Sequence, residues 1–291
     1  MIPSEIIRKV RLIELKTRRI VDDIFGGEYH SAFKGLGMEF EEVREYYPGD
    51  DIRAIDWNVT ARLGKPYIKK YNEERELTVI LLVDVSASGY YGTGEYLKCD
   101  IMIELVSILS FSAIKNNDKV GLLLFSDVIE KYIPPKKGKT HALRVIREMI
   151  YHQNNERGTD IGFALEHIHK VLKRKSIIFL LSDFWDNSFY QSMKRINKKH
   201  DLINIQILDD SERIMPNIGL IKMHDAENQN TTWIDTSDNR NREKISALLL
   251  SKENHILTYC KRNNIDIITI NTRVGYVDPL VHFFNSRFRR H

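Results

Sequence analysis

Three small oxygen-bearing side chains follow the apolar run at residues 79–83. Asp84, Ser86 and Ser88 stand at alternate positions in the stretch LLVDVSAS. Carboxylate and hydroxyl oxygens suit a small, hard cation such as Mg²⁺, which takes six oxygen ligands and keeps several of them as water. Neutral hydroxyl ligands leave such an ion electrophilic, so the site has reason to recruit a carboxylate from elsewhere. Alone, the triplet is equally typical of a strand end followed by a helix-capping turn, where Asp and Ser are favoured.

A second carboxylate stands in a comparable position later in the chain. Asp183 ends the apolar run in FLLSDFWD. Ligands of open parallel sheets bind beyond the carboxyl ends of the strands. If the strands that end at Asp84 and Asp183 are neighbours, both carboxylates face one crevice. Asp183 also has structural alternatives, since it could cap the following helix or pair with Lys194, and Asp186 could compete for either role.

The elements that must place these residues alternate between strand and helix from residue 78 onward. The run at 78–84 is apolar almost throughout, as a parallel strand covered on both faces should be. Further strands are expected at 119–127, 176–183, 201–209 and 265–270, with short ones at 218–225 and 231–236. Helices are expected at 99–118, with Asp100 as a candidate N-cap, and at 139–153, 158–174, 188–199, 240–262 and 278–289. This alternation predicts an α/β fold with a doubly wound, mostly parallel sheet.

The first 77 residues have a different pattern. Apolar residues recur at steps of three and four from Ile6 to Ile24, which predicts an amphipathic helix. Segment 28–77 carries strand-like alternation in MEFEEVREY and KPYIKKYNEE, separated by turns at YYPGDD and RLGKP. We therefore expect a helix and an antiparallel β segment over 1–77, an α/β core over 78–210, and a C-terminal continuation over 211–291.

The charged stretch GDDIRAIDWNVTAR admits two interpretations. Asp50, Asp51 and Asp56, together with Arg53 and Arg62, could form a set of paired carboxylates for acid–base catalysis. Alternatively, they belong to a charged network that holds the segment together, with Trp57 as a hydrophobic anchor and Pro48–Gly49 as the turn. We favour the structural or interface interpretation, because perturbed acids also occur in structural ion-pair networks.

Composition narrows the classes of function. The 291 residues are 42% hydrophobic and 29% charged, and the formal net charge is +4. This near balance gives no case for a nucleic-acid or membrane partner. The N-terminus lacks the apolar centre of a signal peptide and no apolar stretch reaches the length of a bilayer span, so we expect a soluble, cytoplasmic protein. No GxxxxGK[ST] motif occurs, which argues against ATP hydrolysis through a P-loop.

Cysteines and histidines offer no metal cluster of their own. Cys99 and Cys260 are too few and too far apart to suggest a disulfide framework. Cys260 follows apolar residues at helical spacing, which predicts a packed core thiol. His167 and His169 would point to different faces of a helix, which argues against a zinc pair.

The stretch DVSAS resembles the Asp-x-Ser-x-Ser element of the metal-ion-dependent adhesion site in von Willebrand factor A (VWA)-like domains. That family adds a threonine from a later loop and an aspartate after a later strand. The resemblance therefore implies a metal site formed by Asp84, Ser86, Ser88, Thr159 and Asp183, with Thr159 taken from RGTDIGFAL. Thr140, in GKTHAL, is a rival that we rank lower because of its basic setting. Asp160 either contacts the site or occupies the first turn of a helix, where an acid is welcome.

A wider resemblance covers nearly the whole chain. The stretch from GLGMEFEEV through LLVDVSAS closely resembles the signature of the domain of unknown function 58 (DUF58) family, and IMPNIGLIKMHDAENQNTTWIDT and PLVHFFNSRFRR are also similar to it. The resemblance implies a bacterial protein with a VWA-like, Rossmann-like core and a family-specific N-terminal segment. Such proteins are typically encoded beside MoxR-type AAA+ ATPases and are thought to act with them as chaperone-like or maturation factors.

Two classes of function compete. The first is a non-enzymatic binding module that holds Mg²⁺, or alternatively Mn²⁺, and takes an acidic side chain of an ATPase or client protein as its last ligand. The second is a Mg²⁺-dependent phosphohydrolase of the haloacid dehalogenase type, which also places an aspartate after its first strand. Its nucleophile motif needs a second aspartate two residues later, where Ser86 stands, so the acid–base step has no evident agent. We favour the binding module, and a metal-free scaffold is a third alternative.

Overall fold

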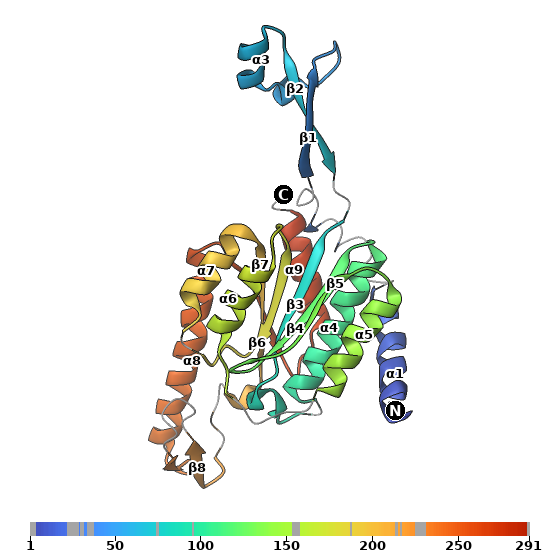
Figure 1. Cartoon of the computed structure of the whole chain (residues 1–291). Helices are drawn as coiled ribbons and strands as arrows, with labels where there is room; N and C mark the ends of the chain where they lie inside the picture. The colour runs from blue at the N-terminus through green and yellow to red at the C-terminus, as the bar shows by residue number, and fades with distance from the viewer. Residues whose placement is uncertain are drawn as a thin grey trace.

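Figure 1 shows a layered body with a narrow hairpin standing off one end. The computed structural model describes residues 4–21, 29, 32–33, 38–73, 76–94, 96–152, 158–186, 188–212, 215, 217–224 and 231–289. The expected end of the first helix, from residue 22 to Ile24, lies outside these residues.

A six-stranded sheet forms the middle layer, in the order β10-β7-β6-β3-β4-β5. Its strands are β3 (Thr78–Asp84), β4 (Lys119–Phe125), β5 (Ile129–Lys136), β6 (Ile177–Ser182), β7 (Asp201–Leu208) and β10 (Asp266–Asn271). Neighbouring strands are parallel except for the antiparallel pair β4–β5. Counted from β5, the strands follow the 3-2-1-4-5-6 order of a doubly wound fold. The predicted doubly wound, mostly parallel sheet is therefore confirmed.

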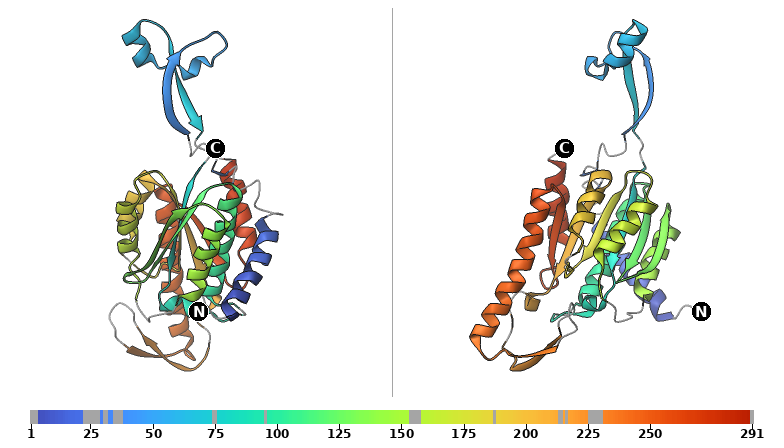
Figure 2. Two further views of the ribbon diagram at one scale, coloured as in Figure 1. Left: turned by 45° about the vertical axis from the view of Figure 1, so that its right-hand side comes forward. Right: turned by 60° about the vertical axis from the view of Figure 1, so that its left-hand side comes forward.

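Helices cover both faces of this sheet. One face carries α4 (Lys98–Lys115), α5 (Lys139–Tyr151) and α9 (Val277–Phe288), and α1 (Ser4–Ile20) packs on α4 and α5 (Figure 2). The other face carries α6 (Ile161–Val171), α7 (Tyr190–Lys199) and α8 (Asn239–Arg262), where Cys260 is a buried core thiol as predicted. α4 is apolar nearly all round because it lies between the sheet and α1. Within the described part of the chain, no helix is long and apolar enough to cross a membrane.

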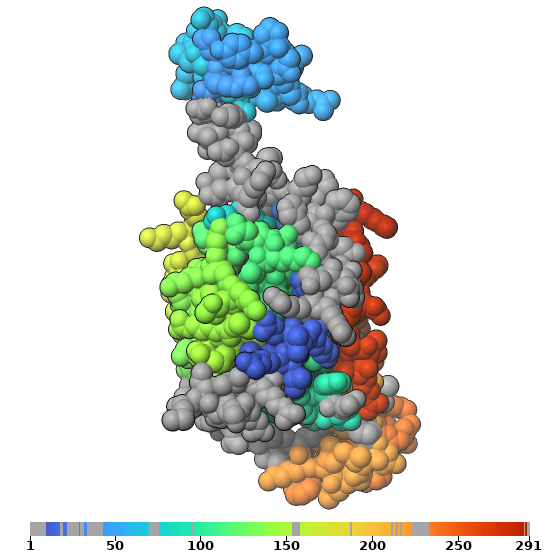
Figure 3. Space-filling view, turned by 90° about the vertical axis from the view of Figure 1, so that its right-hand side faces the viewer, coloured from blue at the N-terminus to red at the C-terminus, as the bar shows by residue number. Residues whose placement is uncertain are grey.

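Two small antiparallel pairs stand at opposite ends of the body. β1 (Met38–Glu45) pairs with β2 (Tyr67–Glu73), and between them lie the short helices η2 (Ile52–Ala54) and α3 (Trp57–Leu63). β2 precedes the amino end of β3, so this hairpin stands at the end of the body opposite to Asp84 (Figures 1 and 3). The other pair, β8 (Leu220–His224) and β9 (Thr231–Asp235), lies beyond the carboxyl ends of the strands with the start of α8. The predicted N-terminal helix and antiparallel β segment are confirmed.

Three local expectations need correction. The sequence pattern misses β5, because IEKYIPPK is a polar edge strand, a position that tolerates its two prolines. It also misses α3, a short helix with no buried side chain. Asp100 is not the N-cap of α4, since Leu97 occupies that position and its N–H donates to Asp100 Oδ2 over 3.2 Å. The division of the chain at residues 77 and 210 stays a prediction.

Candidate metal centre

Asp84 ends β3 at the carboxyl edge, the edge of the sheet at which β3, β4, β6 and β7 all end. The pairing of Val83 with Leu181 places Ser182 of β6 beside it. The Ser182 hydroxyl donates to Asp84 Oδ2 over 2.7 Å, and the N–H of Ser86 donates to Oδ1 over 3.0 Å. Asp84 is buried. These bonds fix the carboxylate at the boundary between the sheet and the loop that follows.

Ser86 and Ser88 lie on the loop and the short helix η3 (Ala87–Tyr90) that follow β3. Their hydroxyl oxygens are 3.1 Å apart, so the alternate spacing brings them to one point. Ser86 is buried at the N-cap position of η3, yet its side chain makes no capping hydrogen bond. Helix capping therefore does not account for this serine.

Asp183 directly follows β6 and is held by a buried lysine. The Nζ atom of Lys98, the first residue of α4, lies 2.9 Å from Asp183 Oδ2, and Lys98 also pairs with Glu212 of η4 (Asp210–Glu212). Lys98 is fully buried. Burial lowers its pKa, but the carboxylates of Asp183 and Glu212 outweigh that effect, and the net direction of the pKa is upward. Among the described residues, Asp183 thus pairs with Lys98 and not with Lys194.

Thr159 precedes α6 and is half-buried. The two residues after it are tied to the carboxyl edge. The N–H of Asp160 donates to the carbonyl of Ser126, after β4, over 3.0 Å. The N–H of Ile161 donates to Asp186, after β6, over 2.9 Å. These bonds place Thr159 at the same edge as the other four predicted ligands, although no hydrogen bond among the described residues joins it to them.

The two competing residues in this region have other positions or roles. Asp160 is the N-cap of α6, and its side chain accepts the N–H of Phe163 over 2.7 Å. Thr140 lies at the opposite edge of the sheet, because β5 runs antiparallel to β4 and α5 begins where β5 ends. His141, its neighbour, contacts the carbonyl of Val120 at the start of β4, with Nε2 3.0 Å from that oxygen. Thr140 is therefore no rival to Thr159.

The charges at this edge are unbalanced toward negative. Burial raises the pKa of Asp84 to about 6, and the neighbouring charge of Asp183 adds to the shift. The cluster holds three carboxylates, on Asp84, Asp183 and Glu212, and among the described residues Lys98 is the cation paired with it. When all three acids are ionised, two negative charges lack a counter-charge, which equals the charge of one divalent cation.

The donor set fits a hard divalent ion. Within the described ranges, no group of three or more His, Cys, Asp or Glu side chains is placed to hold a metal. An ion at the carboxyl edge would therefore depend on the hydroxyls of Ser86 and Ser88 together with the carboxylates. Such an all-oxygen set suits Mg²⁺ or Mn²⁺ better than zinc. The assignment of five metal ligands remains a prediction.

Sequence reasoning misses three side chains that shape this edge, namely Lys98, Ser182 and Glu212. A lysine at the start of a helix has the pattern of a solvated residue, so nothing in the sequence shows that Lys98 is buried. Ser182 could have been inferred from the strand register once β3 and β6 were known to pair. Glu212 lies on a single short turn after β7, where no periodic pattern gives a signal.

The charged stretch on the hairpin has a structural role. Arg44 donates to both carboxylate oxygens of Asp50, over 2.8 and 2.9 Å, and this pairing lowers the pKa of Asp50. Asp51 and Asp56 cap η2 and α3. These roles fit the network interpretation rather than acid–base catalysis. The expectation that Trp57 is a hydrophobic anchor within the chain is wrong, since its side chain is 68% exposed.

Known proteins resemble this chain along most of its length. The model of the family described as "Protein of unknown function DUF58" matches residues 42–255. An uncharacterised protein of Mycobacterium tuberculosis is 29% identical over 222 residues, which cover 75% of this chain and 70% of that protein. Among solved structures, the conserved hypothetical protein BatB from Bacteroides thetaiotaomicron is 14% identical with a TM-score of 0.47, and the match covers 74% of this chain and all of BatB. The VWA domain of SpRpn10 is 15% identical with a TM-score of 0.35, covering 45% of this chain and 75% of that domain.

Proposed function

This chain belongs to the DUF58 family, and from that premise we propose that it is a non-enzymatic protein-interaction module. In this proposal Asp84, Ser86, Ser88, Thr159 and Asp183 hold one Mg²⁺ or Mn²⁺ at the carboxyl edge. The ion, when bound, supplies an electrophilic position for one carboxylate oxygen of a partner protein.

The observation that carries the proposal is the convergence of two serine hydroxyls beside a buried carboxylate. The Oγ atoms of Ser86 and Ser88 are 3.1 Å apart, and Asp84 is oriented by two hydrogen bonds next to them. Hydroxyls are neutral ligands, so they hold a dication without cancelling its charge. An acidic side chain from outside the chain can then complete the coordination.

The same residues argue against a phosphohydrolase. Ser86 stands where the haloacid dehalogenase type needs its second aspartate, and its hydroxyl contacts Ser88. The described groups that donate to Asp84 are the hydroxyls of Ser182 and Ser86 and a backbone N–H, and none of them is an acid. Lys98 is already paired with Asp183 and Glu212. None of these groups offers the general acid–base step.

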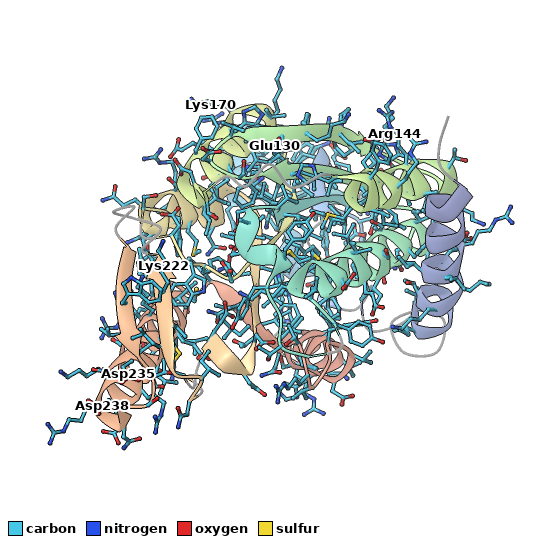
Figure 4. All side chains as sticks on the ribbon, turned by 90° about the horizontal axis from the view of Figure 1, so that it is seen from below. Glu130, Arg144, Lys170, Lys222, Asp235 and Asp238 are labelled. Atoms are coloured by element: carbon cyan, nitrogen blue, oxygen red, sulfur yellow. The ribbon has the colours of Figure 1, made fainter. Side chains whose placement is uncertain are left out.

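We propose a MoxR-type AAA+ ATPase or a client protein as the partner, and a chaperone-like or maturation role. The family resemblance in the sequence supports this choice. Apolar contact area is available at the same end of the body as the proposed metal centre, because Leu220 and Trp233 are exposed on the arm formed by β8, β9 and the start of α8. Lys222, Asp235 and Asp238 mark this arm in Figure 4, which looks onto the carboxyl edge.

Titration calorimetry tests the metal assignment. We expect Mg²⁺ to bind the wild-type chain and to raise its thermal unfolding midpoint, and both effects to be lost in Asp84→Ala. The double variant Ser86→Ala, Ser88→Ala keeps the carboxylates and should also lose binding. Asp51→Ala, which removes an exposed carboxylate from the hairpin, is the matched control and should bind as wild type. Equal binding by wild type and Asp84→Ala would overturn the assignment.

Affinity purification from the native host tests the partner. The full chain is used at physiological Mg²⁺, with and without EDTA, beside the Ser86→Ala, Ser88→Ala variant. We expect an AAA+ ATPase to be recovered by the wild type and lost both with EDTA and in the variant. Recovery that EDTA leaves unchanged contradicts metal-bridged docking. Phosphatase turnover that Asp84→Asn abolishes would favour the enzyme instead.

A further inference from the structure

The hairpin tip, residues 46–66 between β1 and β2, exposes several large apolar side chains. Tyr47, Ile52, Trp57 and Leu63 are 63%, 65%, 68% and 58% exposed. Figures 1 and 3 show the tip standing clear of the body, so no described part of the body covers them. Single exposed apolar residues are ordinary on soluble proteins, but a group of them on one projection marks an interaction site.

The backbone beneath these side chains has a fixed shape. The side chain of Asp56 accepts the N–H groups of Asn58 and Val59, over 2.9 and 3.2 Å, at the start of α3. Gly64 ends that helix with a φ of +72°, and Gly49, with a φ of +111°, forms the turn after Pro48. A scaffold that is already ordered loses less conformational entropy on binding than a flexible loop. The tip is therefore organised before any partner arrives.

Within the part of the chain that the structure describes, two arginines of the tip have no charged partner. The carboxylates of the tip and of its base are engaged: Glu45 with Lys65, Asp50 with Arg44, Asp56 with Lys69, and Asp51 as the cap of η2. Arg53 and Arg62 are exposed, and neither side chain makes an ion pair or hydrogen bond within the described residues. The tip thus exposes both large apolar side chains and two guanidinium groups that are not engaged by the described residues.

We propose that the hairpin tip is a docking surface for a second protein, which presents an apolar pocket bordered by carboxylates. Trp57 enters the pocket, and Arg53 and Arg62 bind the carboxylates around it. Trp, Tyr and Arg are the residue types that dominate binding energy in protein interfaces. The planar guanidinium group also matches a carboxylate with two parallel hydrogen bonds.

This surface is independent of the metal centre. The tip projects from the amino end of β3, and Asp84 lies at the carboxyl end of the same strand. A partner on the tip leaves the carboxyl edge open. One chain can therefore bridge two partners, one bound through a metal and one through the apolar tip.

A protein pocket fits the tip better than a lipid surface does. The carboxylate of exposed Asp51 caps η2 through a backbone N–H and has no cation partner among the described residues, and anionic headgroups repel such a carboxylate. A protein can place its carboxylates opposite Arg53 and Arg62 and keep them away from the neighbouring aspartates. A lipid surface cannot select between neighbouring charges in this way.

Photo-crosslinking with the full chain in the native host tests this proposal. The photoreactive residue p-benzoylphenylalanine replaces Trp57 in one variant and Leu15, an exposed residue of α1, in the control. We expect light to join position 57, but not position 15, to one protein other than this chain. Mass spectrometry should place Asp or Glu residues next to the crosslinked site. Arg53→Glu with Arg62→Glu should reduce the adduct about tenfold, and replacing the partner's acids with Lys should restore it.

Several outcomes would overturn the proposal: adducts only with a second copy of this chain, adducts only with lipid, no adduct, or an adduct that charge reversal leaves unchanged. Asp84→Ala should not alter the adduct, so this test is separate from that of the metal centre. η2 and α3 contain no buried side chains, so the variants should keep the fold, which a thermal unfolding scan checks.

Discussion

The two ends of this molecule use acidic side chains in opposite ways. At the carboxyl edge, Asp84 and Asp183 are buried at the ends of the neighbouring parallel strands β3 and β6, and the hydroxyls of Ser86 and Ser88 meet at the same edge. At the hairpin tip, Asp51 and Asp56 cap short helices and apolar side chains face solvent. Acids are thus candidates for ligand binding at one end and local structural supports at the other.

This difference teaches that burial decides what a charged residue can do. A buried carboxylate must have a counter-charge or a hydrogen-bond donor, so its environment is tied to the stability of the whole fold. An exposed one can cap a helix with little effect beyond that helix. Perturbing the carboxyl edge should therefore change global stability, and perturbing the tip should not.

The largest effect is expected from Lys98→Met. It leaves Asp183 and Glu212 buried without their cation, which should cost about 3–5 kcal/mol of unfolding free energy in chemical denaturation. Added Mg²⁺ should recover part of this loss if an ion binds beside Asp183. The matched control is Lys65→Met, which breaks the exposed Lys65–Glu45 pair of the hairpin. If both variants lose the same stability, the contrast between the two ends is wrong.

The next largest effect is expected at His200, and it tests whether burial or position in the molecule decides the effect of a charge. His200 lies next to the amino end of β7, on the side of the body from which the hairpin projects, yet it is buried and neither ring nitrogen has a hydrogen-bond partner in the described structure. Burial lowers its pKa to about 4, below the 6.5 of the unfolded chain. The unfolded state thus binds the proton first, so stability is lost as the pH falls from 6.5 toward 4.

His200→Phe should remove this dependence. Between pH 6.5 and pH 5 the wild type should lose about 1.5 kcal/mol more unfolding free energy than the variant. Urea unfolding at both pH values measures the difference. His282→Phe, at an exposed position on α9, is the control and should follow the wild type. If His200→Phe loses as much unfolding free energy as the wild type between these pH values, burial of the His200 ring is not the cause of the pH dependence.

The sequence was informative where burial leaves a pattern. β3, β4, β6 and β7 could be predicted because strands covered on both faces are continuously apolar. The same reasoning placed Asp84 and Asp183 at strand ends, whereas the pairing of those two strands comes from the structure. The pattern did not predict β5, because an edge strand needs no continuous run of apolar residues. The burial of Lys98 could not be predicted either, because it depends on two acids that are distant in sequence. Tertiary contacts of that kind leave no local pattern.

The prediction for Trp57 was wrong for the opposite reason. An aromatic residue in a charged segment predicts a buried anchor, and its residue type is right for packing. The hairpin stands away from the body, however, and Trp57 is 68% exposed, so most of its side chain faces solvent. Local sequence cannot tell whether a hairpin folds back or stands off.

A smaller effect is expected from Asp56→Ala, which removes the N-cap of α3. Amide hydrogen exchange should become on the order of fivefold faster in Trp57–Leu63, because the first N–H groups of the helix lose their acceptor. The thermal midpoint of the whole chain should stay at the wild-type value. Asp56→Asn keeps a capping side chain and should exchange at nearly the wild-type rate. A fall in the global midpoint in Asp56→Ala would mean that the tip and the body unfold together.

The smallest effect on stability is expected from Trp57→Ala. The Trp57 ring is mostly exposed, so its removal takes little apolar area out of the folded state and should change unfolding free energy by less than about 0.5 kcal/mol. Chemical denaturation measures this directly, with Phe179→Ala in the sheet as the contrasting variant, where loss of a buried ring should cost about 3–5 kcal/mol. A loss above about 1.5 kcal/mol in Trp57→Ala would place the ring in a packed core and remove it from the proposed docking surface. A neutral result leaves binding to a partner as the reason for a large aromatic side chain on an ordered, solvent-facing tip.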